Sequence, residues 1–156
     1  MPRGQGSGHV GLVKAQKFRG GLVTQTQIIR DGTDMVRQMR PVRVQGEFVF
    51  RALSAHDVVA RLADIRALMI ESEGPSVIVP AQAGDADAMA QITLQVHSAL
   101  DGVGLTAAVS TALAGADIPC NMVAGLHHDH VFVPVALADR ALRILQDLSK
   151  TAGTKG

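Results

Sequence analysis

The sequence predicts an α+β protein, because segments with the periodicity of strands are interleaved with segments that have the periodicity of helices. In residues 90–149, apolar residues first alternate with polar ones and then recur every three or four positions. The order there is strand, helix, strand, strand, helix. Hydrophobic residues make up 47% of the 156 residues, enough for a packed interior, and with four Phe and no Trp or Tyr that interior must be aliphatic.

Each element of residues 90–149 follows from a short pattern. Ile92, Leu94 and Val96 alternate with polar neighbours and predict the first strand. Residues 105–113 are apolar at helical spacing, and Gly115 stands where helices commonly end. Residues 118–124 and 131–135 alternate on either side of Gly125, which predicts a hairpin. The last helix has its apolar stripe at Leu137, Ala141, Leu142, Leu145 and Leu148.

Residues 31–80 predict a first half with the order helix, strand, helix, strand. A short helix over residues 33–39 stops at Pro41, and a strand over residues 43–53 follows, with Gly46 as a site for a bulge. Ser54 and Asp57 resemble a helix capping pair. The apolar stripe of that second helix is Val58, Leu62, Ile65 and Met69. Residues 77–79 predict a central strand, and the small, polar residues 81–89 predict a linker to the second half.

Several short sequence motifs resemble those of the ACT domain, and in particular those of small bacterial stand-alone proteins built from two ACT-like halves. The resemblance spans about residues 31–148. In the second half the motifs are HS at 97–98, GVGLTAA at 102–108, NMVAG at 121–125 and HDHVFVP at 128–134. In the first half they are MRP at 39–41, GEFVF at 46–50 and ESEGP at 71–75.

The resemblance implies a ferredoxin-like, ACT-type βαββαβ sandwich with the two ACT-like halves packed together. Against that pattern, residues 90–149 lack a final strand, because the polar tail at residues 150–156 is unsuited to one. Either the first half lends a strand, or the sheet continues into a partner chain. We favour an intramolecular arrangement.

The distribution of charge argues against a nucleic-acid partner. Residues 1–30 contain five Lys or Arg and no Asp or Glu, which leaves 10 basic and 14 acidic side chains, a net charge of −4, in the other 126 residues. Nucleic-acid binding depends on clustered cations that replace counterions on phosphate. Residues 1–30 are also rich in Gly and Gln, and we expect a basic extension that is either flexible or adventitious.

Other bulk features predict a cytoplasmic protein without membrane contact. No apolar run approaches the roughly 20 residues that cross a bilayer, and the first residues do not resemble a signal peptide. Cys120 is the single cysteine, so an internal disulfide is impossible, which agrees with a reducing compartment.

A histidine cluster is one candidate for chemistry. His97, His128, Asp129 and His130 are residue types that bind zinc and similar ions. On a strand, however, His128 and His130 would share a face while Asp129 points the opposite way, so the ligand set is incomplete. We favour hydrogen-bonded structural histidines over a metal site and expect no cofactor.

The second candidate is the glycine-containing turn at residues 102–106. Glycines let the backbone approach a ligand, and free amides at a helix start attract a carboxylate. The resemblance implies that ACT domains hold a small amino acid here, between this turn and the facing strand. The predicted ligand-binding residues are Gly102, Val103, Gly104, Leu105, Thr106 and Asn121.

Three functions agree with these features. The favoured one is a non-enzymatic, regulatory ACT-type protein that binds a small amino acid and acts on a separate protein. The second is a structural or dimerisation module without a ligand, since exposed sheet edges favour a homo-oligomer. The third is a metal-dependent enzyme that uses the histidine cluster. Ser98, Ser110 and Thr111 lack the context of a catalytic nucleophile, and phosphate-loop and dinucleotide fingerprints are absent.

Overall fold

The structure, a computed structural model, describes residues 28–153, so most of the expected N-terminal extension and the last three residues lie outside it. Within this part of the chain, no helix has the length and apolar character needed to span a membrane. The elements are α1 (Gly32–Gln38), β1 (Pro41–Arg43), β2 (Phe48–Ala52), α2 (Ala55–Ala60), β3 (Ala67–Glu71), β4 (Gly74–Pro80), β5 (Met89–Leu94), α3 (Leu105–Ala114), β6 (Asn121–Ala124), β7 (Asp129–Pro134), a 3-10 turn (Val135–Leu137) and α4 (Ala138–Ala152).

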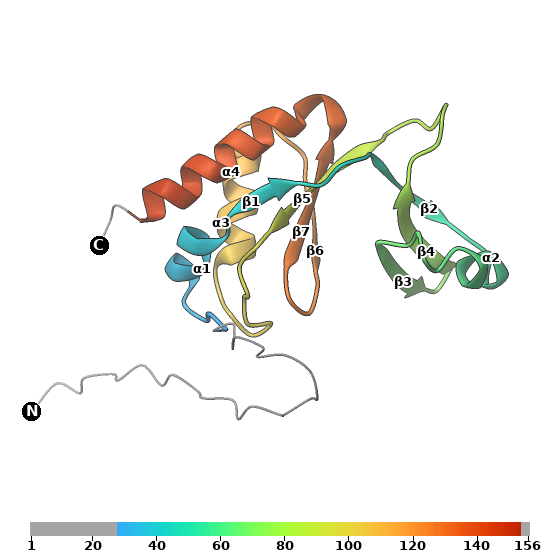
Figure 1. Cartoon of the computed structure of the whole chain (residues 1–156), viewed down its shortest axis with the longest axis horizontal. Helices are drawn as coiled ribbons and strands as arrows, with labels where there is room; N and C mark the ends of the chain where they lie inside the picture. Colours follow the sequence, from blue (N-terminus) through green and yellow to red (C-terminus); the bar gives the residue numbers. More distant parts are fainter. Residues whose placement is uncertain (1–27, 154–156) are drawn as a thin grey trace, which may run out of the picture.

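Figure 1 shows two parts that share one antiparallel sheet, which confirms the predicted α+β class. The strand order is β3-β4-β2-β5-β7-β6, and β1 pairs separately with β5. In the helical part, α1, α3 and α4 pack on β1, β5, β7 and β6. In the small part, α2 accompanies β2, β3 and β4. The sheet continues between the two parts through one pair of residues, Phe48 and Met89.

The helical part is a complete βαββαβ unit because β1 supplies its sixth element. β1 lies antiparallel to β5, with Pro41 opposite Leu94 and Arg43 opposite Ile92. The strand order β1-β5-β7-β6 then places the lent strand at one edge and β6 at the other. The strand missing from residues 90–149 is therefore lent from the first half of the same chain. α1 accompanies β1 and packs against α4.

The interior of the helical part is aliphatic, as predicted. Ala90, Ile92 and Leu94 of β5 face the helices and are fully buried against residues such as Val109 and Leu145. The buried phenylalanines lie on the opposite face of the sheet, where the two parts meet. There Phe132 of β7 makes edge-to-face ring contacts with Phe48 and Phe50 of β2, at centroid distances of 6.2 and 5.5 Å.

Two expectations about the first half were wrong in detail. The predicted helix with a stripe to Met69 ends at Ala60, and residues 67–71 form β3, which pairs with β4. The pattern misled because Leu68, Met69 and Ile70 make a continuous apolar run that suits an edge strand as well as a helix. The predicted strand over residues 43–53 is divided into β1 and β2, and Gly46 lies in the break with φ +97°.

Replacing Met39 by Ala tests whether the segment before β1 belongs to the core of the helical part. Met39 is 0% exposed within that core, so we expect the free energy of unfolding to fall by about 2–5 kcal/mol in urea denaturation. Gln38→Ala, one residue earlier on the exposed side of α1, should change it by about 0.5 kcal/mol or less. If both substitutions lowered the free energy of unfolding by the same small amount, this segment would not be part of the folded core.

Candidate functional site

The loop that leads from β5 into α3 begins with a short strand-like contact. Ser98 forms an isolated parallel bridge with Ile29, whose amide donates to the His97 carbonyl oxygen at 2.9 Å. α3 then begins at Leu105 behind Gly104, which has φ +116° and supplies no side-chain cap. The amides in the first turn of a helix have no partner within that helix and carry a partial positive charge. This end of α3 is therefore suited to an anionic group.

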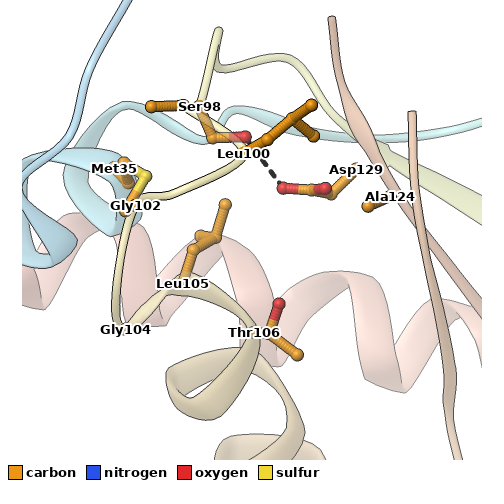
Figure 2. Close-up of a pocket in the computed structure, with 10 residues that line it drawn as sticks. Met35, Ser98, Leu100, Gly102, Gly104, Leu105, Thr106, Ala124 and Asp129 are labelled. Carbon is orange, nitrogen blue, oxygen red and sulfur yellow. Dashed lines mark hydrogen bonds between the residues drawn. The ribbon is translucent and has the colours of Figure 1, made fainter. Parts of the chain in front are cut away.

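A cavity of about 120 Å³ lies in front of this helix end. It is bounded by the loop, by the start of α3, by α1 and by the turn end of β6 and β7. Figure 2 shows the Asp129 carboxylate and the Thr106 hydroxyl directed toward this space. The lining residues are Met35, Ser98, Ala99, Leu100, Gly102, Gly104, Leu105, Thr106, Ala124 and Asp129.

Asp129 is the charged residue that lines the cavity, and it is 8% exposed. It is the first residue of β7 and lies opposite Ala124 of β6 and Leu94 of β5. The Ser98 hydroxyl donates a hydrogen bond to its Oδ2 at 2.9 Å. A buried carboxylate needs such partners, because burial without them disfavours its charge. The cavity thus has a positive helix end and a negative side chain.

The structure separates the residues that the sequence grouped as ligand-binding. Gly102, Gly104, Leu105 and Thr106 line the cavity, whereas the Val103 side chain is 83% exposed and borders a shallow groove on the other side of the loop, beside Gly32.

Asn121 is not brought to the cavity. It begins β6 and bonds to the Met89 sulfur, three residues before Ala124, or roughly 10 Å along a strand. The sequence placed it beside the loop, whereas the cavity lies at the turn end of β6, next to Ala124, and Asn121 lies at the other end of that strand.

Six of the ten residues that line the cavity were not predicted to bind a ligand, and Ser98 and Met35 show why. Ser98 follows a predicted strand and belongs to the HS motif at 97–98, but that motif did not assign it to the ligand site. Met35 lies on α1, more than sixty residues before the loop, and no local pattern connects them. Close packing does so in the folded chain: a Cβ on Gly102 would lie 2.9 Å from the Met35 Cε, and one on Gly32 would lie well inside van der Waals contact of the Val103 carbonyl oxygen. The two glycines therefore let α1 sit against the loop.

The four histidines of the second half fall into two groups, with His97, His127 and His128 together and His130 apart from them. The His97 and His128 rings meet edge to face at 4.8 Å, and His127 lies 5.8 Å from His97. His130 instead hydrogen-bonds through Nδ1 with Thr93 Oγ1 at 3.0 Å and with the Gln91 side-chain amide at 3.1 Å. Among residues 28–153, no three His, Cys, Asp or Glu side chains are placed to hold a metal ion.

Burial governs the titration of the groups around these strands. It lowers the pKa of His97, assisted by the charges that His128 and His127 can carry. It also lowers the pKa of His130, where His128 and Arg66 act in the same direction and Asp129 opposes them. Burial raises the pKa of the Cys120 thiol, which agrees with the prediction of a small apolar residue rather than a nucleophile.

The family models match the two halves of the chain separately. One ACT domain model matches residues 89–147 and a second matches residues 29–94. A solved structure of a Vibrio cholerae protein of unknown function, described as a possible transport protein, is 36% identical. The match covers 73% of this chain and 92% of that one, with a TM-score of 0.64. The chain therefore belongs to the ACT domain family, as the sequence predicted.

Two further solved structures share the fold at lower identity. A protein from Agrobacterium tumefaciens is 17% identical over 70% of this chain and 87% of that one, with a TM-score of 0.55. A structure of aspartokinase alpha and beta subunits is 13% identical over 69% of this chain and 95% of that one, with a TM-score of 0.52. A search of curated proteins found no significant match.

Changing Gly32 to Ala tests the packing of α1 on the loop. The new Cβ would collide with the Val103 carbonyl oxygen, so the loop or α1 must move, and we expect a loss of about 1–3 kcal/mol in the free energy of unfolding. Gly115→Ala is the control. Gly115 has φ −63°, which any residue can adopt, and a Cβ there would lie 3.3 Å from the nearest carbonyl oxygen, so it would not collide as the Cβ at Gly32 does. A Gly32→Ala protein as stable as the wild type would contradict the observed contact.

The lowered pKa of His130 predicts that acid destabilises the fold. The unfolded state binds the proton more readily than the folded state, so the free energy of unfolding falls as pH drops from about 6.5 through the lower folded pKa. His130→Gln should lower stability at neutral pH but flatten this acid dependence, measured by urea unfolding at several pH values. His56→Gln, on the exposed side of α2, should keep the wild-type slope. An unchanged slope in His130→Gln would refute the assignment.

Proposed function

We propose that the chain is a non-enzymatic regulatory ACT-type protein that binds a small amino acid in the cavity between α3 and Asp129. ACT domains are typically ligand-binding regulatory modules, and the chain belongs to that family. The observation that carries the proposal is the opposition of a free helix N-terminus and a buried carboxylate across one small cavity.

The two charged groups of an amino acid match the two ends of this cavity. Its α-carboxylate would accept hydrogen bonds from the amides of Leu105 and Thr106, where the backbone approaches over Gly104. Its α-ammonium group would face Asp129, whose Oδ2 already accepts a bond from Ser98. Both groups are then paired, as a partly buried site requires.

The size and lining of the cavity restrict the side chain of the ligand. A volume of about 120 Å³ is below the roughly 300–1,000 Å³ of sites for drug-sized molecules. Met35 and Leu105 are apolar and buried, and the lining from residues 28–153 contains no Lys or Arg that could pair with a second carboxylate. These features favour an amino acid with a short, uncharged side chain.

The same lining supports a binding role rather than a catalytic one. Among the described residues no imidazole lines the cavity, and the acceptor of the Ser98 hydroxyl is the Asp129 carboxylate, so the Ser-His pair typical of a catalytic serine is absent there. Regulation would then depend on ligand binding that changes the affinity for a separate protein. A dimerisation module without ligand is the second candidate, and the exposed apolar residues of the small part favour it.

The test is a thermal-shift screen of the full chain with the twenty amino acids, repeated on Asp129→Asn. We expect one or a few amino acids with short, uncharged side chains to stabilise the wild type, by about 2.7 kcal/mol at 100 times the dissociation constant. Asp129→Asn can still accept from Ser98 but cannot pair with the ammonium, so the stabilisation should be lost. Asp64→Asn, which changes an exposed carboxylate of the small part, should retain it.

Two results would defeat the proposal. One is the absence of a shift with every amino acid. The other is equal stabilisation by the 2-hydroxy acid analogue of a stabilising amino acid, because that compound lacks the ammonium group that Asp129 is proposed to hold.

A further inference from the structure

One wall of the cavity is supplied by α1, which lies outside the second half of the chain. Among the described residues, Met35 is the one lining residue that comes from the first half. Figure 2 shows its thioether beside Gly102, on the side of the cavity away from Asp129. The Met35 side chain is 1% exposed, so it is enclosed between α1, the loop and the cavity. It therefore closes the cavity on the side away from the carboxylate.

The end of the Met35 side chain occupies space that a side chain at position 102 would otherwise fill. A Cβ on Gly102 would lie 2.9 Å from the Met35 Cε and 3.0 Å from its Sδ. The thioether thus lies directly against the backbone of the loop. Methionine is unbranched and adapts its shape to irregular gaps, so it fits this space closely.

The backbone of α1 is fixed at both ends, so it cannot withdraw to enlarge the cavity. At its start, the Asp31 side chain accepts a hydrogen bond from the Asp34 amide at 3.0 Å. Near its end, the Ser149 hydroxyl of α4 donates to the Arg37 carbonyl oxygen at 2.9 Å. The depth of the cavity on this side is therefore set by the length of the side chain at position 35.

The other apolar side chains of the lining are less able to limit a ligand. Ala99 and Ala124 contribute only methyl groups. Leu100 is 70% exposed, so it lies largely in solvent. Leu105 is buried, but it is the first residue of α3, and its amide belongs to the proposed carboxylate site. Met35 is the large buried side chain that is separate from both charged ends of the cavity.

We propose that Met35 determines the longest side chain that the cavity accepts. This assignment rests on the proposed function, in which the start of α3 holds the α-carboxylate and Asp129 holds the ammonium group. With these two groups fixed, the side chain of the ligand extends to the remaining wall and ends against the Met35 thioether. A ligand side chain that is too long must displace the thioether, which is already packed against Gly102. Specificity for a short side chain therefore comes from a residue of the first half.

The first experiment measures dissociation constants by calorimetry for the full chain and for Met35→Ala. The ligands are glycine, alanine, 2-aminobutyrate, norvaline and norleucine, which differ only in the length of an unbranched side chain. We expect the wild type to lose affinity toward the long end of the series. Met35→Ala leaves a space that fixed surroundings refill only partly. In this variant, norleucine should gain on alanine by on the order of tenfold or more.

Met39→Ala is the matched control, because Met39 is also buried in the core of the helical part but does not line the cavity. It should keep the wild-type order of affinities despite its loss of stability. If Met35→Ala binds but keeps that order, or if the wild type binds norleucine as tightly as alanine, this assignment is wrong and the proposed function stands. A wild type that binds no amino acid would overturn both.

The second experiment uses the wild type alone, so it does not depend on the folding of Met35→Ala. The methionine methyl groups are labelled with carbon-13, and the Met35 resonance is identified by its absence from Met35→Leu. It should shift on addition of alanine and shift further with 2-aminobutyrate, whereas the Met39 resonance should stay in place. A Met35 resonance that is unchanged when the amides of residues 102–107 have shifted would overturn the assignment.

Discussion

The pairing of β1 with β5 is the constraint on which the rest of the structure depends. Without it, β5 would be the edge of a three-stranded sheet, and the buried apolar face of residues 90–149 would be incomplete. Three backbone pairs, from Pro41 to Arg43, make the connection. They also determine where α1 must lie, because only two residues separate its last residue, Gln38, from Pro41.

The position of α1 in turn shapes the cavity. Met35 and Met39 are buried in the same core as α3 and α4, so α1 cannot move away without exposing them. The first residue of α1, Gly32, packs against the loop at Val103. Met35 lines the cavity in front of α3. The proposed ligand site is therefore built from both halves of the chain, although its glycines, helix start and carboxylate all come from the second. A ligand that orders the loop would therefore also restrict the position of α1, through the contacts of Gly32 and Met35.

The sequence predicted what local chemistry determines and missed what distant segments bring together. The helix that starts behind Gly104, and the hairpin around Gly125, follow from turn residues and periodicity, and the motifs led correctly to the ACT family. The helix predicted as far as Met69 failed because an apolar run has no single period, and pairing with β4 decided its conformation. Asn121 was expected beside the loop because the sequence does not show which end of β6 lies at the cavity.

The role of Asp129 also could not be predicted from local sequence patterns. By residue type it belonged with the neighbouring histidines, and only the pairing of β5 with β7 brings it to Ser98 and into the cavity. Likewise, no spacing in the sequence could place Met35 beside Gly102, because that contact depends on the lent strand.

The most direct test of the central claim is an amide NMR titration of the full chain with the amino acid that stabilises it. If that ligand binds between the start of α3 and Asp129, the largest shifts should fall on the amides of residues 102–107 and of Asp129. The amides of Asn121 and of β3 should move little. Shifts concentrated elsewhere, or none at saturating ligand, would show that this cavity is not the binding site.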